Sequence, residues 1–424
     1  MDRNVRHFCR SGPEAGHRDW IECKHIMHRE NGMRPEQFQI HVPESELEDL
    51  ERRLGNSKLP DDFGNETWRY GTEKTYLQSL LDYWLHDYNW RKHEAKMNRF
   101  AHYRVVIDDV PIHFIHHKSG KENAVPLIMT HGWPWTFWDF QHVIEPLADP
   151  AAYGGNVDDA FDIIVPSLPG YAFSSPLCKT GVSAKATADL WHKLMTEVLG
   201  YEKYAAHGGD WGGYVTGQLG YKYPGHLIGI HMINGAPLDW NVKGLPGPEE
   251  YAPEEAGWRE RTHKFFADHQ GYYAQQGTKP QTLAYGLSDS PAGLCAWLLE
   301  KRRSWSDCGG DVERRYSKDD LLTSIMLYWV TNTIGTSIRM YYESGNDLWQ
   351  PPAEMPKDGK FIRVPTGILK LEKDLVHFPR AAVERQINVQ RWTNHAVGGH
   401  FAPFEEPQLV IDELRGFFAP YRAR

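Results

Sequence analysis

Short, apolar segments alternate with helical segments over much of this 424-residue chain. The apolar segments comprise residues 125–130, 161–165, 204–206 and 227–233, and, after a long interruption, 361–365 and 389–393. Stretches with apolar residues at helical spacing lie between them, such as residues 184–199. A strand that is apolar on both sides must be covered on both faces. The pattern therefore predicts an α/β fold with a doubly wound, mostly parallel sheet.

The interruption divides the chain into candidate regions. Residues 238–346 hold aromatic residues at helical spacing and no clear strand, so we expect a helical cap there. It would separate a first part of the core, 101–237, from a second part, 347–424, which closes with a helix over 407–418. The first part would open with a β-hairpin turning at Asp108 and Asp109. Ahead of the core, the amphipathic residues 34–100 predict a helical meander, and residues 1–33 a tail.

Composition argues against several classes of function. The formal net charge is −9 and the basic residues are scattered, which argues against nucleic acid as a partner. No apolar run reaches the roughly 18 residues that a membrane span needs, and the polar start does not resemble a signal peptide. The five cysteines are widely spaced and include no CxxC pair, a pattern typical of a reduced, cytoplasmic protein.

The N-terminal tail contains residue types that bind zinc. They are Cys9, His17, Cys23, His25 and His28. Their spacing matches no familiar zinc-binding motif, so we expect a flexible tail and no metal site.

The sharpest chemical signal follows the segment 204–206, where residues 208–213 are Gly-Gly-Asp-Trp-Gly-Gly. In open parallel sheets, ligands bind where strands end and helices begin. Gly208 and Gly212 stand two residues before and after Asp210, where small residues allow the strained turn called a nucleophile elbow. Asp210 thus occupies the usual place of a serine, and the helix N-terminus behind it favours the ionised carboxylate. The alternative is an ordinary N-cap aspartate in a glycine-rich turn.

Two further strand ends carry unusual residues. His-Gly-Trp-Pro follows the segment 125–130, and the backbone N–H of its Trp133 is expected to form an oxyanion-binding pair with that of Trp211. Gly-Gly-His-Phe follows the last apolar segment, and its His400 is placed to act as a base. Together the three strand ends favour a catalytic site built around Asp210 and His400.

These motifs make the chain similar to the microsomal-type epoxide hydrolases, which include soluble bacterial and fungal relatives and the insect juvenile hormone enzymes. The resemblance runs over residues 34–421 and rests on HGWP, GGDWGG, the block from Lys279 to Lys301 and GGHFAPFEEP at 398–407. It includes an N-terminal helical region with the segments WRYG at 68–71, YW at 83–84, NWR at 89–91 and NRF at 98–100. The resemblance implies the α/β-hydrolase fold with an inserted helical cap.

The resemblance also implies a role for each matching residue. Asp210 corresponds to the family's nucleophile and His400 to its base. The charge-relay acid of the family lies before a helix that follows the motif VPTG. Asp374 falls on that position, ahead of the competitors Glu372 and Asp347.

Two cap tyrosines donate hydrogen bonds to the epoxide oxygen in this family. Tyr272 matches the first, with Tyr273 as the neighbouring alternative, and Tyr341 matches the second, with Tyr342 as its alternative. The tyrosine hydroxyl, with an ordinary pKa of about 10, stays protonated at neutral pH and suits the poor alkoxide leaving group.

The implied reaction converts a small apolar epoxide and water to a vicinal diol, and it requires neither a metal ion nor an organic cofactor. The nearest rival is a haloalkane or haloacid dehalogenase, which shares the Asp–His pair but replaces the tyrosines by halide-binding N–H groups. A non-catalytic binding protein of the same fold is the rival from another class. The membrane anchor of some relatives is not carried over, and the sequence leaves the oligomeric state open, a homodimer included.

Overall fold

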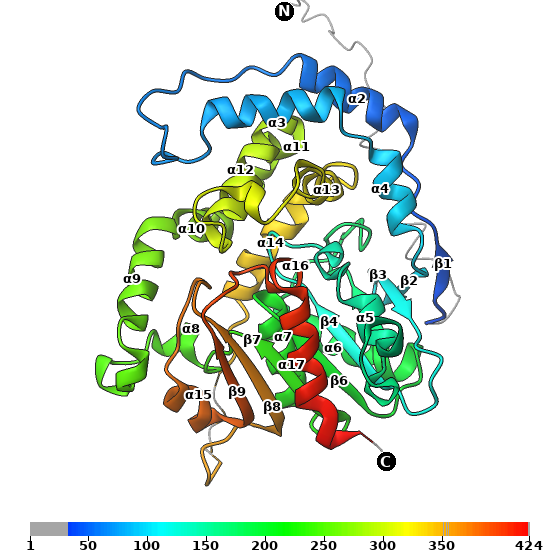
Figure 1. Cartoon of the computed structure of the whole chain (residues 1–424), viewed down its shortest axis with the longest axis vertical. Coiled ribbons are helices and arrows are strands. Elements are labelled where there is room, and N and C mark those ends of the chain that lie inside the picture. Colours follow the sequence, from blue (N-terminus) through cyan, green and yellow to red (C-terminus); the bar gives the residue numbers. More distant parts are fainter. Residues whose placement is uncertain (1–32, 351, 353, 355, 423–424) are drawn as a thin grey trace, which may run out of the picture.

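A nine-stranded sheet runs through the centre of the protein (Figure 1). The computed structural model describes residues 33–350, 352, 354 and 356–422, so the candidate zinc ligands of the tail lie outside the described residues. The strand order is β1-β2-β3-β5-β4-β6-β7-β8-β9. The strands are β1 (Glu36–Phe38), β2 (His102–Ile107), β3 (Val110–His117), β4 (Val125–Thr130), β5 (Phe161–Pro166), β6 (Tyr204–Gly208), β7 (Leu227–Ile233), β8 (Ile362–Leu371) and β9 (Ile387–His395).

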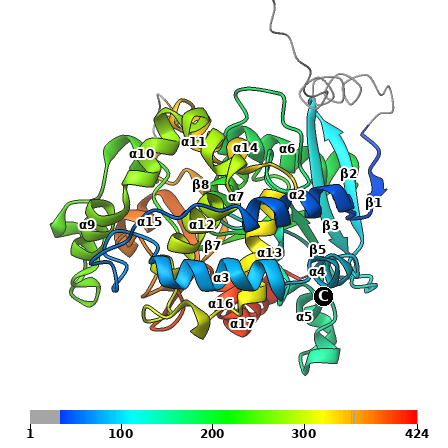
Figure 2. The same ribbon diagram turned by 90° about the horizontal axis from the view of Figure 1, so that it is seen from above.

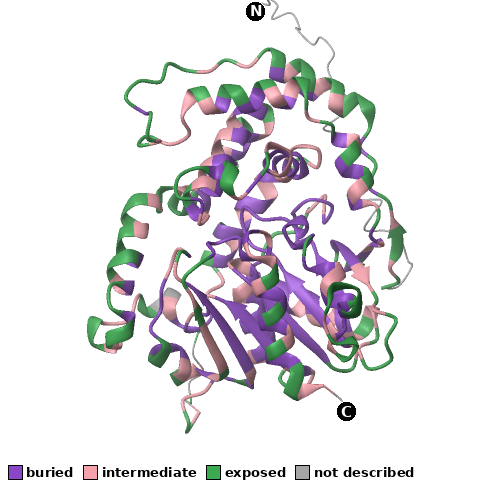
Figure 3. Ribbon diagram, viewed as in Figure 1, coloured by how far each residue is buried: buried purple, intermediate pink, exposed green. Residues whose placement is uncertain are grey.

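The sheet is parallel from β5 to β9 and antiparallel from β1 to β5, which confirms the mostly parallel arrangement. The strand interiors are the most completely buried part of the chain (Figure 3). The expected hairpin is present, and Asp108 and Asp109 take the positive φ angles of 50° and 63° that its two-residue turn requires. Strands β6 and β8 extend beyond the apolar segments that predicted them, because they pair with β7 and with β9 over additional residues.

Helices cover both faces of the sheet, as a doubly wound fold requires. They are α5 (Ile144–Ala148), α6 (Ala184–Lys193), α7 (Trp211–Lys222), α15 (Arg380–Gln386), α16 (Ala402–Glu405) and α17 (Pro407–Phe418). Helix α7 packs on α6 and α17 on α5. Gly229 of β7 faces Phe417 of α17, whereas the side chain of its neighbour Ile230 contacts Gly220 of α7. Adjacent residues of a strand point to opposite faces, so α7 and α17 lie on opposite sides of the sheet.

Between β7 and β8 the described residues form helices and loops without a strand. The helices are α8 (Trp240–Lys243), α9 (Trp258–His269), α10 (Gly271–Thr278), α11 (Pro280–Asp289), α12 (Pro291–Trp305), α13 (Lys318–Trp329) and α14 (Ile334–Gly345). Helices α10 to α14 lie above the carboxyl ends of the parallel strands (Figure 1). No helix in the described part of the chain has the length and apolarity needed to cross a membrane.

The N-terminal region wraps over this helical insert. Helices α2 (Glu44–Gly55), α3 (Lys74–His86) and α4 (Trp90–Met97) pack against α12 and α13 (Figure 2). The region also contains β1, which the sequence analysis did not predict. This three-residue strand pairs with β2 at the edge of the sheet through its backbone, so its side chains carry little strand signal.

Among the described residues, Cys295 and Cys308 are free thiols, and both are buried. Cys9 and Cys23 lie outside the described residues, so the reduced state expected of the cysteines stays a prediction.

Candidate active site

Asp210 lies in a strained turn between β6 and α7. Its φ of 52° and ψ of −128° fall in a region that side chains other than glycine rarely adopt. A Cβ atom on Gly212 would lie 1.9 Å from the carbonyl oxygen of Thr130, and one on Gly208 would lie 2.3 Å from the carbonyl carbon of Gly212. The turn therefore needs glycine at both positions. The Asp210 side chain makes no capping hydrogen bond to α7, which argues against the N-cap alternative.

The loop after β4 holds one oxygen of the Asp210 carboxylate. The backbone N–H of Trp133 donates a hydrogen bond of 2.8 Å to Asp210 Oδ1. Glycine at position 132 allows this close approach, because a Cβ atom there would lie 2.4 Å from the same oxygen. Trp211, the other expected oxyanion donor, is the first residue of α7. A role for its backbone N–H stays a prediction.

His400 lies between two carboxylates. Its Nδ1 is 2.9 Å from Asp374 Oδ1, and its Nε2 is 3.5 Å from Asp210 Oδ2. The competing acids lie elsewhere: Glu372 pairs with Arg261 at 2.7 Å, and Asp347 accepts a 2.6 Å hydrogen bond from Ser183. Asp374 follows β8 and His400 follows β9, so both lie at the same edge of the sheet as Asp210. The structure thus brings together the three residues expected from the sequence.

The two carboxylates keep the His400 imidazole protonated. Burial lowers the pKa of His400, but the charges of Asp374 and Asp210 and the hydrogen bond with Asp374 outweigh burial and raise it to about 9. Burial raises the pKa of Asp374, yet the charge of His400 and its hydrogen bond bring the net value below 3.8. At neutral pH the free site therefore holds an imidazolium, and His400 can act as a base only after it has given up this proton.

The predicted tyrosines reach the site from the helical insert. Tyr272 is on α10 and Tyr341 on α14, and their ring centroids are 5.8 Å apart. Both rings contact the indole of Trp133, at centroid distances of 5.5 and 5.7 Å. Burial, followed by neighbouring charges, raises the pKa of both hydroxyls above the ordinary value, so they stay protonated.

The two alternative tyrosines, Tyr273 and Tyr342, differ in their position relative to the cavity. Tyr342 is 43% exposed, and it is not among the residues that line the cavity around Asp210. Tyr273 is 40% exposed but lines that cavity together with Tyr272 and Tyr341. Position therefore favours Tyr341 over Tyr342 and leaves Tyr272 and Tyr273 both within the site.

The cavity between core and insert is mostly apolar. Asp210, Asp374, His400 and the tyrosines line one part of it. The remaining lining includes Met232, Leu238, Trp240, Phe265, Phe266 and Phe378. Such walls favour an uncharged, apolar ligand whose reactive end meets the polar groups.

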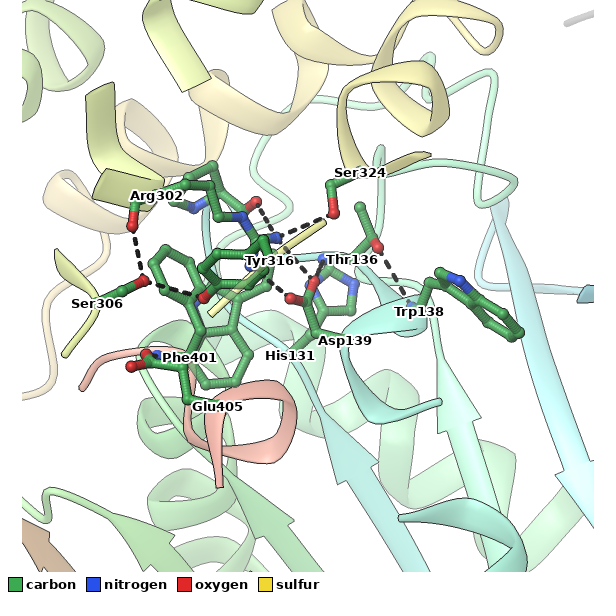
Figure 4. A network of polar contacts seen from close by, with 12 residues as sticks. His131, Thr136, Trp138, Asp139, Arg302, Ser306, Tyr316, Ser324, Phe401 and Glu405 are labelled. Atoms are coloured by element: carbon green, nitrogen blue, oxygen red, sulfur yellow. Dashed lines mark hydrogen bonds and ion pairs between the residues drawn. The ribbon is translucent and has the colours of Figure 1, made fainter. Parts of the chain in front are cut away.

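A buried ion pair, which the sequence analysis missed, ties the insert to the core. Arg302 of α12 contacts Asp139 in the loop after β4 at 2.6 Å, and its guanidinium lies 4.1 Å from the centroid of the Phe401 ring (Figure 4). Arg302 also donates to the carbonyl oxygen of Pro134. Arg302 therefore contacts both the Trp133 loop (residues 131–136) and the His400 loop (residues 396–401). Nothing in the sequence distinguishes Arg302 from the adjacent Arg303.

Comparisons with known proteins agree with this arrangement. Residues 125–289 match the family model described as the alpha/beta hydrolase fold, and residues 35–140 match that described as Epoxide hydrolase N terminus. The fold and site thus define an enzyme of the α/β-hydrolase class. Epoxide hydrolase 1 of Sus scrofa is 34% identical, over 90% of this chain and 87% of its own.

Solved structures support the same assignment. Juvenile hormone epoxide hydrolase from the silkworm Bombyx mori superposes with a TM-score of 0.82 at 28% identity, covering 93% of this chain and 96% of that one. The epoxide hydrolase of Aspergillus niger superposes with a TM-score of 0.78 at 28% identity, covering 91% and 96%. The chain belongs to the epoxide hydrolase family.

The charge on His400 predicts a pH-dependent contribution to stability. An unfolded histidine titrates near 6.5, whereas His400 titrates at about 9 in the folded chain. The contribution is therefore complete below the unfolded value and is lost as the pH rises through the folded one. We expect the difference in unfolding free energy between the wild type and His400→Gln to fall by about 3 kcal/mol from pH 6 to pH 9.5. Urea unfolding at both pH values measures it, and a difference independent of pH would contradict the assignment.

Proposed function

We propose that this epoxide hydrolase works through a covalent ester on Asp210. The proposal rests on one observation: the two carboxylate oxygens of Asp210 have different surroundings. Oδ1 accepts the Trp133 N–H, whereas Oδ2 faces His400 across 3.5 Å, and Asp210 lines the cavity. In the proposal Oδ2 attacks a ring carbon of the epoxide, and Oδ1 becomes the carbonyl oxygen of the ester.

Ring opening breaks a carbon–oxygen bond and leaves charge on the epoxide oxygen. In the proposal Tyr272 and Tyr341 donate hydrogen bonds to that oxygen, and one of them transfers its proton as the bond breaks. Attack then comes from the core and proton donation from the helical insert. The products of this step are a hydroxyalkyl ester on Asp210 and a tyrosinate, which takes back a proton from the His400 imidazolium.

Formation of the ester removes the negative charge of Asp210. Because that carboxylate helps to raise the pKa of His400, esterification lowers it and favours the neutral imidazole. Neutral His400, oriented by Asp374, then takes a proton from water, and the hydroxide attacks the ester carbonyl carbon. The Trp133 N–H, with the N–H of Trp211 as the proposed second donor, stabilises the oxyanion. Collapse releases the diol, which takes the proton from His400, and the Asp210 carboxyl proton returns to the imidazole.

The apolar cavity supports a small apolar epoxide as substrate, with its reactive end toward Asp210. The homodimer and the cytoplasmic location stay predictions. Cell fractionation tests the location and sedimentation the oligomeric state.

The dehalogenase rival makes the opposite prediction about products. We expect the enzyme to convert styrene oxide to its diol and to release no halide from a chloroalkane of similar size, because the tyrosines suit an oxygen leaving group. Diol formation by chromatography and halide release by ion electrode measure the two activities. Halide release without diol would contradict the proposal, and the absence of both would favour a binding protein.

Replacing each proposed proton donor and its neighbouring tyrosine by phenylalanine tests which hydroxyl groups take part in ring opening. We expect Tyr272→Phe and Tyr341→Phe each to slow ester formation in single-turnover experiments by about tenfold or more, since general acids contribute about 10²- to 10⁴-fold. Tyr342→Phe, at a neighbouring position outside the cavity lining, should stay within about threefold of the wild type. A larger loss in Tyr273→Phe than in Tyr272→Phe would move the role to Tyr273.

A further inference from the structure

Glu405 of α16 is a buried carboxylate beside the catalytic histidine, with a residue exposure of 7%. Its oxygens accept three backbone hydrogen bonds, from Phe401 at 2.9 Å, Gly399 at 3.1 Å and Asp307 at 2.7 Å. Phe401 and Gly399 are the two neighbours of His400 in the chain. One carboxylate therefore holds the backbone on both sides of the proposed base.

The third hydrogen bond connects this loop to the helical insert. Asp307 follows the end of α12, and His400 itself donates its backbone N–H to the carbonyl oxygen of Trp305, the last residue of α12, at 2.9 Å. A Cβ atom on Gly399 would lie 2.5 Å from the Asp307 nitrogen. The His400 loop and the end of α12 thus lie in direct contact, with Glu405 bonded to both.

Only an ionised carboxylate satisfies this arrangement fully. A carboxylate accepts at both oxygens, whereas an amide would present a donor to at least one N–H group and a protonated acid accepts more weakly at its hydroxyl oxygen. Burial raises the pKa of Glu405 to about 7, although the three N–H groups and the charge of Arg315 oppose that rise, so the ionised form is the major one above about pH 7. Keeping a carboxylate in such a place costs stability, which points to a use for it.

We propose that Glu405 is a positioning residue that holds the His400 imidazole in line with the Asp210 ester and couples it to the cap helix α12. This inference rests on the proposed function. Arg302 supports the same loop from the other side through the Phe401 ring, and Figure 4 shows Phe401 and Glu405 near that ion pair. Glu405 does not line the substrate cavity.

The proposed mechanism predicts which step depends on Glu405. Asp210 and the tyrosines form the ester, whereas His400 acts as a base only when the ester is hydrolysed. A loosened His400 loop therefore slows hydrolysis more than alkylation. A displacement of about 1 Å at a reacting group can cost about 100-fold in rate.

The test is Glu405→Gln, which removes the charge and turns a donor toward the backbone N–H groups. We expect ester hydrolysis to slow by about 10- to 100-fold while ester formation changes less than about threefold. The Asp210 peptide should then carry the mass of the added epoxide during turnover, measured by quenched-flow mass spectrometry.

The matched control is Glu406→Gln at the adjacent position. Glu406 pairs with Arg315 at 2.7 Å, and its side chain, which packs beside Gly398, makes no hydrogen bond with residues 398–401 in the described structure. We expect this variant to hydrolyse the ester at the wild-type rate. If Glu405→Gln does not fold, Glu405→Asp keeps the charge with a shorter reach and should show the same selective slowing to a smaller degree.

Three outcomes separate the two ideas. No ester in the wild type or in His400→Gln would overturn the covalent mechanism and this inference with it. Ester in His400→Gln but wild-type hydrolysis in Glu405→Gln would overturn the role of Glu405 alone. An equal loss of both steps in Glu405→Gln, without ester accumulation, would show a general structural role and would also overturn it.

Discussion

The close approach of three backbone segments at Asp210 is the constraint on which the site depends. The ends of β4 and β6 and the start of α7 meet there with glycine at 132, 208 and 212, and at each of these positions a Cβ atom would overlap a neighbour. The resulting turn holds Asp210 at a positive φ, a conformation that typically costs about 1–3 kcal/mol. The turn places the carboxylate in the lining of the cavity, within reach of both the Trp133 N–H and His400.

Charge balance follows from this placement. Asp210 and Asp374 lie on opposite sides of one imidazole, and their combined effect on its pKa exceeds that of burial. A reaction that turns Asp210 into a neutral ester changes this balance without moving any residue. The site therefore has a physical means of switching His400 from imidazolium to base after the first chemical step. Buried contacts of Arg302 and Glu405 connect to the two loops that carry Trp133 and His400.

The sequence allowed prediction of the residues at strand ends, because parallel strands bring their carboxyl ends to one edge and glycine marks the tight turns. Asp374 and the tyrosines required the family resemblance, since nothing in their local sequence indicates chemistry. Strand β1 went unpredicted because it depends on pairing between distant segments. The same holds for the Arg302–Asp139 pair, whose members are 163 residues apart.

In the proposed mechanism an oxygen atom of the Asp210 side chain enters the product. A single turnover in ¹⁸O-water with enzyme in excess over styrene oxide tests this directly. We expect a diol without ¹⁸O from the first turnover, and ¹⁸O in the Asp210 peptide afterwards. A fully labelled diol from the first turnover, with no label in that peptide, would show direct attack by water and would contradict it.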